Sequence, residues 1–107
     1  MTGDEAVALI QDYRRNEYCH RGSVLCIKQD VHLKRCALGR YLCAELIRAI
    51  RASRKNPIHV VHDIYRMLDD VLCESDDDQF EVHEFAAMME LEVANILRYL
   101  KMKERNE

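Results

Sequence analysis

Apolar residues recur along this chain at spacings of three, four or seven positions, which is the period of a helix with one buried face. Four stretches follow the pattern: residues 2–20, 23–55, 57–74 and 80–104. Only three Gly and one Pro interrupt the 107 residues, whereas the turns of a β-protein consume both residue types. The pattern therefore predicts an all-α fold, a four- or five-helix antiparallel bundle, in a single domain that spans residues 1–107.

The spacing also predicts which side chains face the core. On the first stretch they are Ala6, Val7, Ile10 and Tyr13. On the third they include Ile58, Val61, Ile64, Leu68, Val71 and Leu72. On the last they are Phe85, Met89, Val93, Ile96, Leu97 and Leu100.

Local signals mark where the first and third helices begin. Thr2 or Asp4 is placed to cap the first helix, where acidic residues also complement the helix dipole. Asn56 followed by Pro57 is a strong start signal, because Asn is a favoured N-cap and Pro fits the first helical position.

The second stretch is much longer than its neighbours. Its apolar stripe is continuous enough for one helix, but Gly39 weakens the helix and the pair Lys34-Arg35 interrupts the stripe. We therefore expect a kink or a break between Leu33 and Arg40, and residues 23–55 form either one helix or two.

Two segments share the pattern C-x-x-G-x-x-L-C: CHRGSVLC at 19–26 and CALGRYLC at 36–43. Cysteines seven positions apart on a helix share a face but are separated by about 10.5 Å along the axis, beyond the reach of a disulfide. Zinc sites use closer pairs. We interpret these residues as buried cysteines that fill the core as small apolar side chains.

The chain lacks recognisable catalytic signatures. It contains no G-x-S-x-G, no phosphate-binding glycine loop and no G-x-G-x-x-G. We therefore expect no enzymatic activity and no cofactor.

One group of residues has the chemistry of metal ligands. His59 and His62 lie one turn apart on the predicted third helix with Asp63 next to them, so the three could hold a transition metal, particularly across a dimer interface. The alternative interpretation is that they are solvent-facing polar residues opposite the apolar stripe.

Charge is segregated along the chain, although the net charge is only −3. Residues 21–55 hold nine Lys/Arg and two acidic residues, whereas residues 56–95 hold one Arg and eleven Asp/Glu. The basic partner-binding residues that we predict form a stripe on the second helix: Arg40, Arg48, Arg51 and Lys55. The acidic ones that we predict are Asp69, Asp70, Asp76, Asp77 and Asp78. Alternatively, the two halves face each other or are simply solvated.

Apolar stripes, segregated charge and missing catalytic motifs are typical of an interaction protein. We predict a small helical interaction or regulatory module that forms a homodimer and binds another protein, as an inhibitor or adaptor of a charged partner. In the dimer, the basic helix of one subunit meets the acidic region of the other. The alternative is a nucleic-acid-binding protein that uses the basic stripe, and a third option is a metal-binding helical protein.

The expected location is the cytoplasm, without a membrane partner. No apolar run approaches the roughly 18 residues of a membrane span, and the first residues lack the pattern of a signal peptide. The odd number of cysteines, five, fits a reducing compartment.

Overall fold

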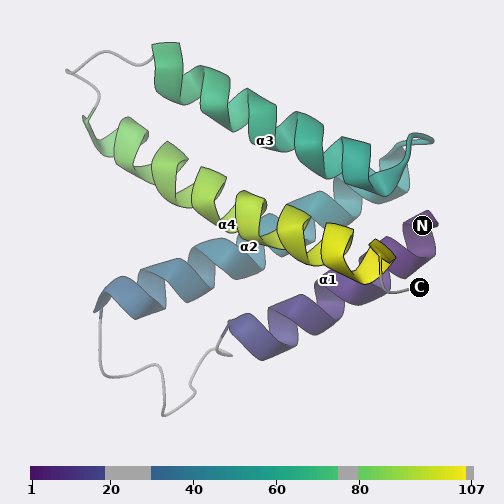
Figure 1. Cartoon of the computed structure of the whole chain (residues 1–107). Coiled ribbons are helices and arrows are strands. Elements are labelled where there is room, and N and C mark those ends of the chain that lie inside the picture. The colour runs from purple at the N-terminus through teal and green to yellow at the C-terminus, as the bar shows by residue number, and fades with distance from the viewer. Residues whose placement is uncertain (19–29, 75–79, 106–107) are drawn as a thin grey trace.

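Four helices make up the fold in a computed structural model that describes residues 1–18, 30–74 and 80–105 (Figure 1). They are α1 (Gly3–Glu17), α2 (Asp30–Ala52), α3 (Pro57–Glu74) and α4 (Phe80–Arg105). No strand occurs within the described ranges, which confirms the prediction of an all-α helical bundle. None of the described helices combines the length and the apolar character needed to cross a membrane.

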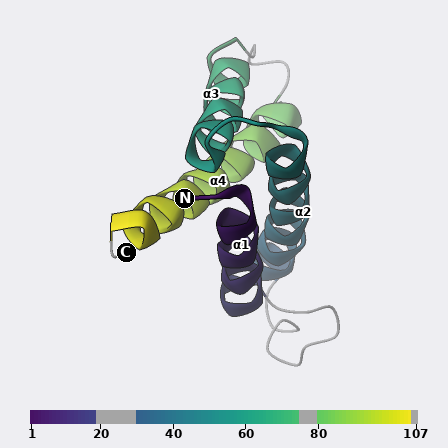
Figure 2. The same cartoon turned by 90° about the vertical axis from the view of Figure 1, so that its right-hand side faces the viewer.

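The helices are arranged as two antiparallel hairpins that cross each other. α1 and α2 form one hairpin, and α3 and α4 form the other (Figures 1 and 2). The tip of the second hairpin, where α3 ends and α4 begins, points away from the first hairpin (Figure 1). As a result, the two hairpins share a core over only part of their length.

The predicted helix starts are confirmed by their hydrogen bonds. Thr2 Oγ1 accepts a hydrogen bond from the backbone N–H of Glu5 at 3.1 Å. Asn56 Oδ1 accepts one from the N–H of Ile58 at 2.9 Å, and Pro57 is the first residue of α3. Each cap satisfies a backbone donor that lacks an intrahelical partner.

All four helices contribute to one hydrophobic cluster. Its members on α1 are the predicted face, Ala6, Val7, Ile10 and Tyr13. On the other helices its fully buried members include Cys43, Leu46, Val61, Val93, Ile96 and Leu100. Burial of large aliphatic side chains contributes about 1.5–3 kcal/mol each, so this cluster is the main source of stability.

The apolar stripes predicted on α3 and α4 extend beyond the part of these helices that is buried in the core. Val71 on α3 and Phe85 on α4 are 45% and 56% exposed, so the prediction that both are buried is wrong. Both lie in the halves of α3 and α4 that form the projecting tip, where the other hairpin no longer covers them (Figure 1). Val60 and Val71 are eleven positions apart on the same side of α3, so a side of the helix that is buried at Val60 is exposed at Val71.

α2 continues unbroken through Gly39, so a break between Leu33 and Arg40 is wrong for the described part of the chain, and a kink there stays a prediction. A Cβ atom at Gly39 would lie 2.2 Å from two atoms of the Tyr18 ring. The absence of a side chain therefore lets the segment that leaves α1 pack directly on α2. The N-terminal part of the predicted stretch, residues 23–29, lies outside the described residues.

Two of the repeated cysteines have the buried position that we predicted. Cys36 and Cys43 are 1% and 0% exposed, whereas Cys73 on α3 is exposed. The other two members of the repeat, Cys19 and Cys26, lie outside the described residues.

Burial should make these core thiols unreactive. It raises the pKa of the Cys43 thiol to about 11, so the nucleophilic thiolate is scarce at neutral pH. We expect iodoacetamide to modify Cys73 in the folded protein while Cys36 and Cys43 stay unmodified until urea is added, as measured by peptide mass spectrometry. Native labelling of Cys43 as fast as that of Cys73 would contradict the burial.

Candidate functional site

The predicted basic residues lie along α2 and the turn that follows it. Arg48, Arg51 and Lys55 are exposed, and Arg40 is half-buried. Arg48 pairs with Glu45 in the same helix, with 3.1 Å between Nη1 and Oε1. Arg54, which the sequence analysis did not select, is also exposed. We call the exposed set of Arg48, Arg51, Arg54 and Lys55 the basic surface.

The acidic residues are divided between described and undescribed parts of the chain. Asp69 and Asp70 are exposed on α3, together with Asp63, and we call these three the acidic surface. The other predicted members, Asp76, Asp77 and Asp78, lie outside the described residues. The two surfaces touch at one edge, because Lys55 Nζ lies 3.9 Å from Asp63 Oδ2.

The proposed metal ligands do not converge within one chain. His59 and Asp63 are exposed, and His62 is half-buried. Among the described residues, no three His, Cys, Asp or Glu side chains lie close enough together to hold a metal ion. A metal site at this place would therefore require ligands from outside the described residues of one chain.

A buried ion pair between α2 and α4 was not selected by the sequence analysis. Arg35 Nε donates to Glu92 Oε1 at 2.6 Å, which is short for a charge-assisted hydrogen bond. Glu92 is 3% exposed and is the buried charged residue of the described chain, whereas the Arg35 side chain is 35% exposed. The carboxylate is thus inside the protein, and the guanidinium connects it to the surface.

A row of three contacting tyrosines begins beside this pair. The guanidinium carbon of Arg35 lies 5.2 Å from the centre of the Tyr18 ring, within the range of a cation–π interaction. Tyr13 packs against Tyr18 and Tyr99, with ring centres 5.8 Å and 5.1 Å apart. The ion pair and the aromatic rings therefore form one connected centre at the junction of α1, α2 and α4.

The electrostatics of the centre keep its groups in defined states. Burial, and next the charge of Glu92, raise the pKa of Tyr18, so its phenol stays protonated. Burial alone would lower the pKa of Arg35, but the attraction of the Glu92 carboxylate outweighs it and raises that pKa. The centre therefore contains an ion pair beside the neutral phenol of Tyr18.

One buried oxygen in the centre, Glu92 Oε2, has no hydrogen-bond partner within the described part of the chain. The Tyr18 hydroxyl, in contrast, lies close enough to the Tyr13 hydroxyl for a side-chain hydrogen bond. Buried polar atoms without a partner cost free energy and are uncommon, so this centre has hydrogen-bonding capacity that the described residues do not use.

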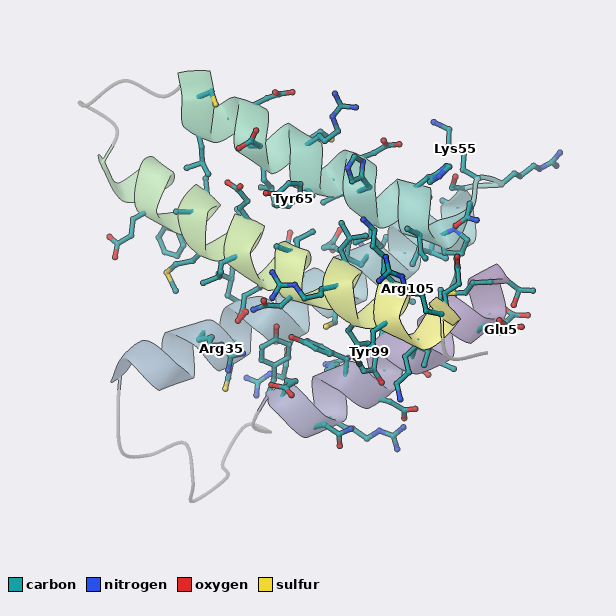
Figure 3. All side chains as sticks on the ribbon, viewed as in Figure 1. Glu5, Arg35, Lys55, Tyr65, Tyr99 and Arg105 are labelled. Atoms are coloured by element: carbon teal, nitrogen blue, oxygen red, sulfur yellow. The ribbon has the colours of Figure 1, made fainter. Side chains whose placement is uncertain are left out.

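A groove of about 300 Å³ opens beside the centre. Its walls come from three helices: Tyr13 and Glu17 on α1, Arg35 on α2, and Asn95, Arg98 and Tyr99 on α4. In Figure 3, Arg35 and Tyr99 lie on the same side of the molecule, below α4. The groove thus combines cationic, amide and aromatic side chains, and Arg35 joins it to the buried ion pair.

The sequence contains a signal for this centre. Glu92 falls among the apolar positions of the last helix, next to Val93, and Arg35 interrupts the apolar stripe of the second stretch. Two opposite charges that both interrupt buried faces are candidates to pair with each other.

No protein-family model, curated protein or solved structure matches this chain.

Proposed function

We propose that this protein is a non-catalytic helical interaction module that forms a homodimer in the cytoplasm. In the dimer, the basic surface of each subunit faces the acidic surface of the other. A two-fold axis makes the two contacts equivalent, so each subunit contributes both surfaces. Another protein of opposite charge would bind one of these surfaces in place of the second subunit, as an inhibitor or an adaptor does.

The observation that carries this proposal is that the helices of both charged surfaces also expose apolar side chains. On α3, Met67 and Val71 are 66% and 45% exposed beside Asp70. On α2, Tyr41 is 59% exposed two turns before Arg48, on the same side of the helix. Exposed apolar area gives association its free energy, and complementary charges beside it select the partner and its orientation.

Charge reversal should weaken this dimer. We expect the double variant Arg48→Glu/Arg51→Glu to raise the dimer dissociation constant at least about tenfold, because each of the two equivalent contacts loses an attraction and gains a repulsion. Analytical ultracentrifugation over a dilution series at low and high salt would measure it. Lys101→Glu/Arg105→Glu, which changes the net charge equally on α4, is the control and should leave the constant unchanged.

A second double variant, with the opposite charge change, tests whether the basic and acidic surfaces contact each other in the dimer. Asp69→Arg/Asp70→Arg should also dissociate alone, but an equimolar mixture with Arg48→Glu/Arg51→Glu should form a heterodimer. Both contacts of that heterodimer would join opposite charges, whereas each variant's homodimer would join like charges. A mixture that stays monomeric, or a wild-type chain that is monomeric at all concentrations, would refute the proposal.

The same variants distinguish the proposed dimer from the alternative function, which is direct nucleic-acid binding through the basic surface. In that case Arg48→Glu/Arg51→Glu would lose salt-sensitive retention on heparin, and Asp69→Arg/Asp70→Arg would gain it. Mixing the two variants would then restore nothing, because no contact between subunits is involved.

A further inference from the structure

The groove beside the Arg35–Glu92 pair has the composition of a small-ligand site. Its volume of about 300 Å³ is at the lower end of the range for such sites. It adjoins the Arg35–Glu92 pair, and the Arg35 side chain of that pair belongs to the groove lining. Neither property is needed for the interaction module proposed above.

We propose that this groove binds a small organic carboxylate with an aromatic body. Guanidinium and amide groups on one wall would bind the carboxylate, and aromatic side chains with a thioether would pack against the ring. The proposal is independent of the dimer, since its residues belong to neither the basic nor the acidic surface.

The carboxylate side of the groove is formed mainly by α4. Arg98 is exposed on that helix, and Asn95 lies three residues before it, on the same side by helical spacing. Arg35 contributes from α2; its contact with Glu92 uses Nε, so the terminal Nη nitrogens are outside that contact. Because Glu92 already balances the charge of Arg35, Arg98 should supply most of the attraction for an anion.

The ring side of the groove is formed by Tyr13, Tyr99 and Met102. The two tyrosine rings are tilted by 53° with centres 5.1 Å apart, so together they form an aromatic wall of the groove. Lys103 lies over the Tyr99 ring, with Nζ 5.6 Å from its centre, and adds positive charge near the groove. Met102 is 51% exposed, so its side chain is accessible to a ligand.

Glu17 sets the orientation of the ligand. It is the carboxylate in the groove lining and comes from α1, whereas Arg98 and Asn95 come from α4. Repulsion from Glu17 should keep a bound carboxylate toward α4. Glu17→Gln should consequently tighten binding, which is the opposite of the effect expected at Arg98.

Phenylacetate is the probe for the test, observed by NMR of the methionine methyl groups. A ring stacked near Met102 should shift its methyl resonance, which Met102→Leu would assign. We expect a saturable shift with phenylacetate and binding at least about tenfold weaker in Arg98→Gln, because a hydrogen bond to a charged group is lost. Arg105→Gln, a change of the same type outside the groove lining, should bind like the wild type.

Two further ligands separate the contribution of the ligand's carboxylate from that of its aromatic ring. Benzyl alcohol keeps the ring without the charge, and acetate keeps the charge without the ring, so both should bind at least tenfold more weakly than phenylacetate. No saturable shift at Met102, equal binding of benzyl alcohol, or equal losses in Arg98→Gln and Arg105→Gln would each overturn the proposal. None of these results depends on whether the protein is a dimer.

Discussion

Replacing Arg35 by methionine is expected to lower the free energy of unfolding by about 2–4 kcal/mol. The substitution leaves the Glu92 carboxylate, 3% exposed, without the cation that compensates its burial. Removing one partner of a fully buried pair costs about 3–5 kcal/mol, and we reduce that figure because the Arg35 side chain is 35% exposed and screened by solvent. Urea denaturation followed by far-UV circular dichroism would measure the loss.

The double variant Arg35→Met/Glu92→Leu is the informative control. Because apolar replacements of a buried pair are often neutral or stabilising, it should recover most of the stability that Arg35→Met loses. Glu92→Leu alone should cost less than Arg35→Met, since the partly exposed guanidinium can be hydrated. If the double variant were as unstable as the sum of the two single variants, the pair would not be coupled as described.

Gly39→Ala is expected to destabilise the protein by about 2 kcal/mol, even though alanine favours a helix over glycine by about 1 kcal/mol. The new methyl group would lie 2.2 Å from two atoms of the Tyr18 ring, which is 2% exposed and has little room to move. Overpacking of this kind costs about 1–3 kcal/mol, and occasionally more. Thermal and urea denaturation of the variant would give the net effect.

If the effect of Gly39→Ala on stability changes sign when the Tyr18 ring is removed, the contact with that ring is the cause of the destabilisation. In a Tyr18→Ala background the ring is absent, so Gly39→Ala should become stabilising by about 0.5–1 kcal/mol through helix propensity alone. An osmolyte such as sucrose can compensate for the stability lost with Tyr18 while both variants are compared. Destabilisation by Gly39→Ala in both backgrounds would mean that the helix, rather than the ring contact, requires glycine.

Much of the fold could be predicted from local pattern. The face of α1 and the caps at Thr2 and Asn56 depend on residues within a turn or two of each other, and sequence spacing reports such relations directly. The burial of Cys36 and Cys43 follows from the same helical period.

Contacts between distant segments account for what could not be predicted. Arg35 and Glu92 are 57 positions apart, and only the crossing of the two hairpins brings them together. Gly39 was interpreted as a weak point in a helix because the ring that packs on it belongs to another segment. The exposure of Val71 and Phe85 likewise depends on where a neighbouring hairpin ends, which their own helices do not encode.

One half of α3 is packed against the shared core and the other half is more exposed, and this difference affects local unfolding. At Val60 and Val61 the helix is held by the shared core, but at Met67 and Val71 it lacks that cover. Local opening free energies follow such differences in buried contact, so the outer half of the α3–α4 hairpin should separate and re-form without global unfolding. We therefore expect two cooperative units of unequal stability: a stable crossing of the four described helices, and a less stable tip that a partner could stabilise by binding.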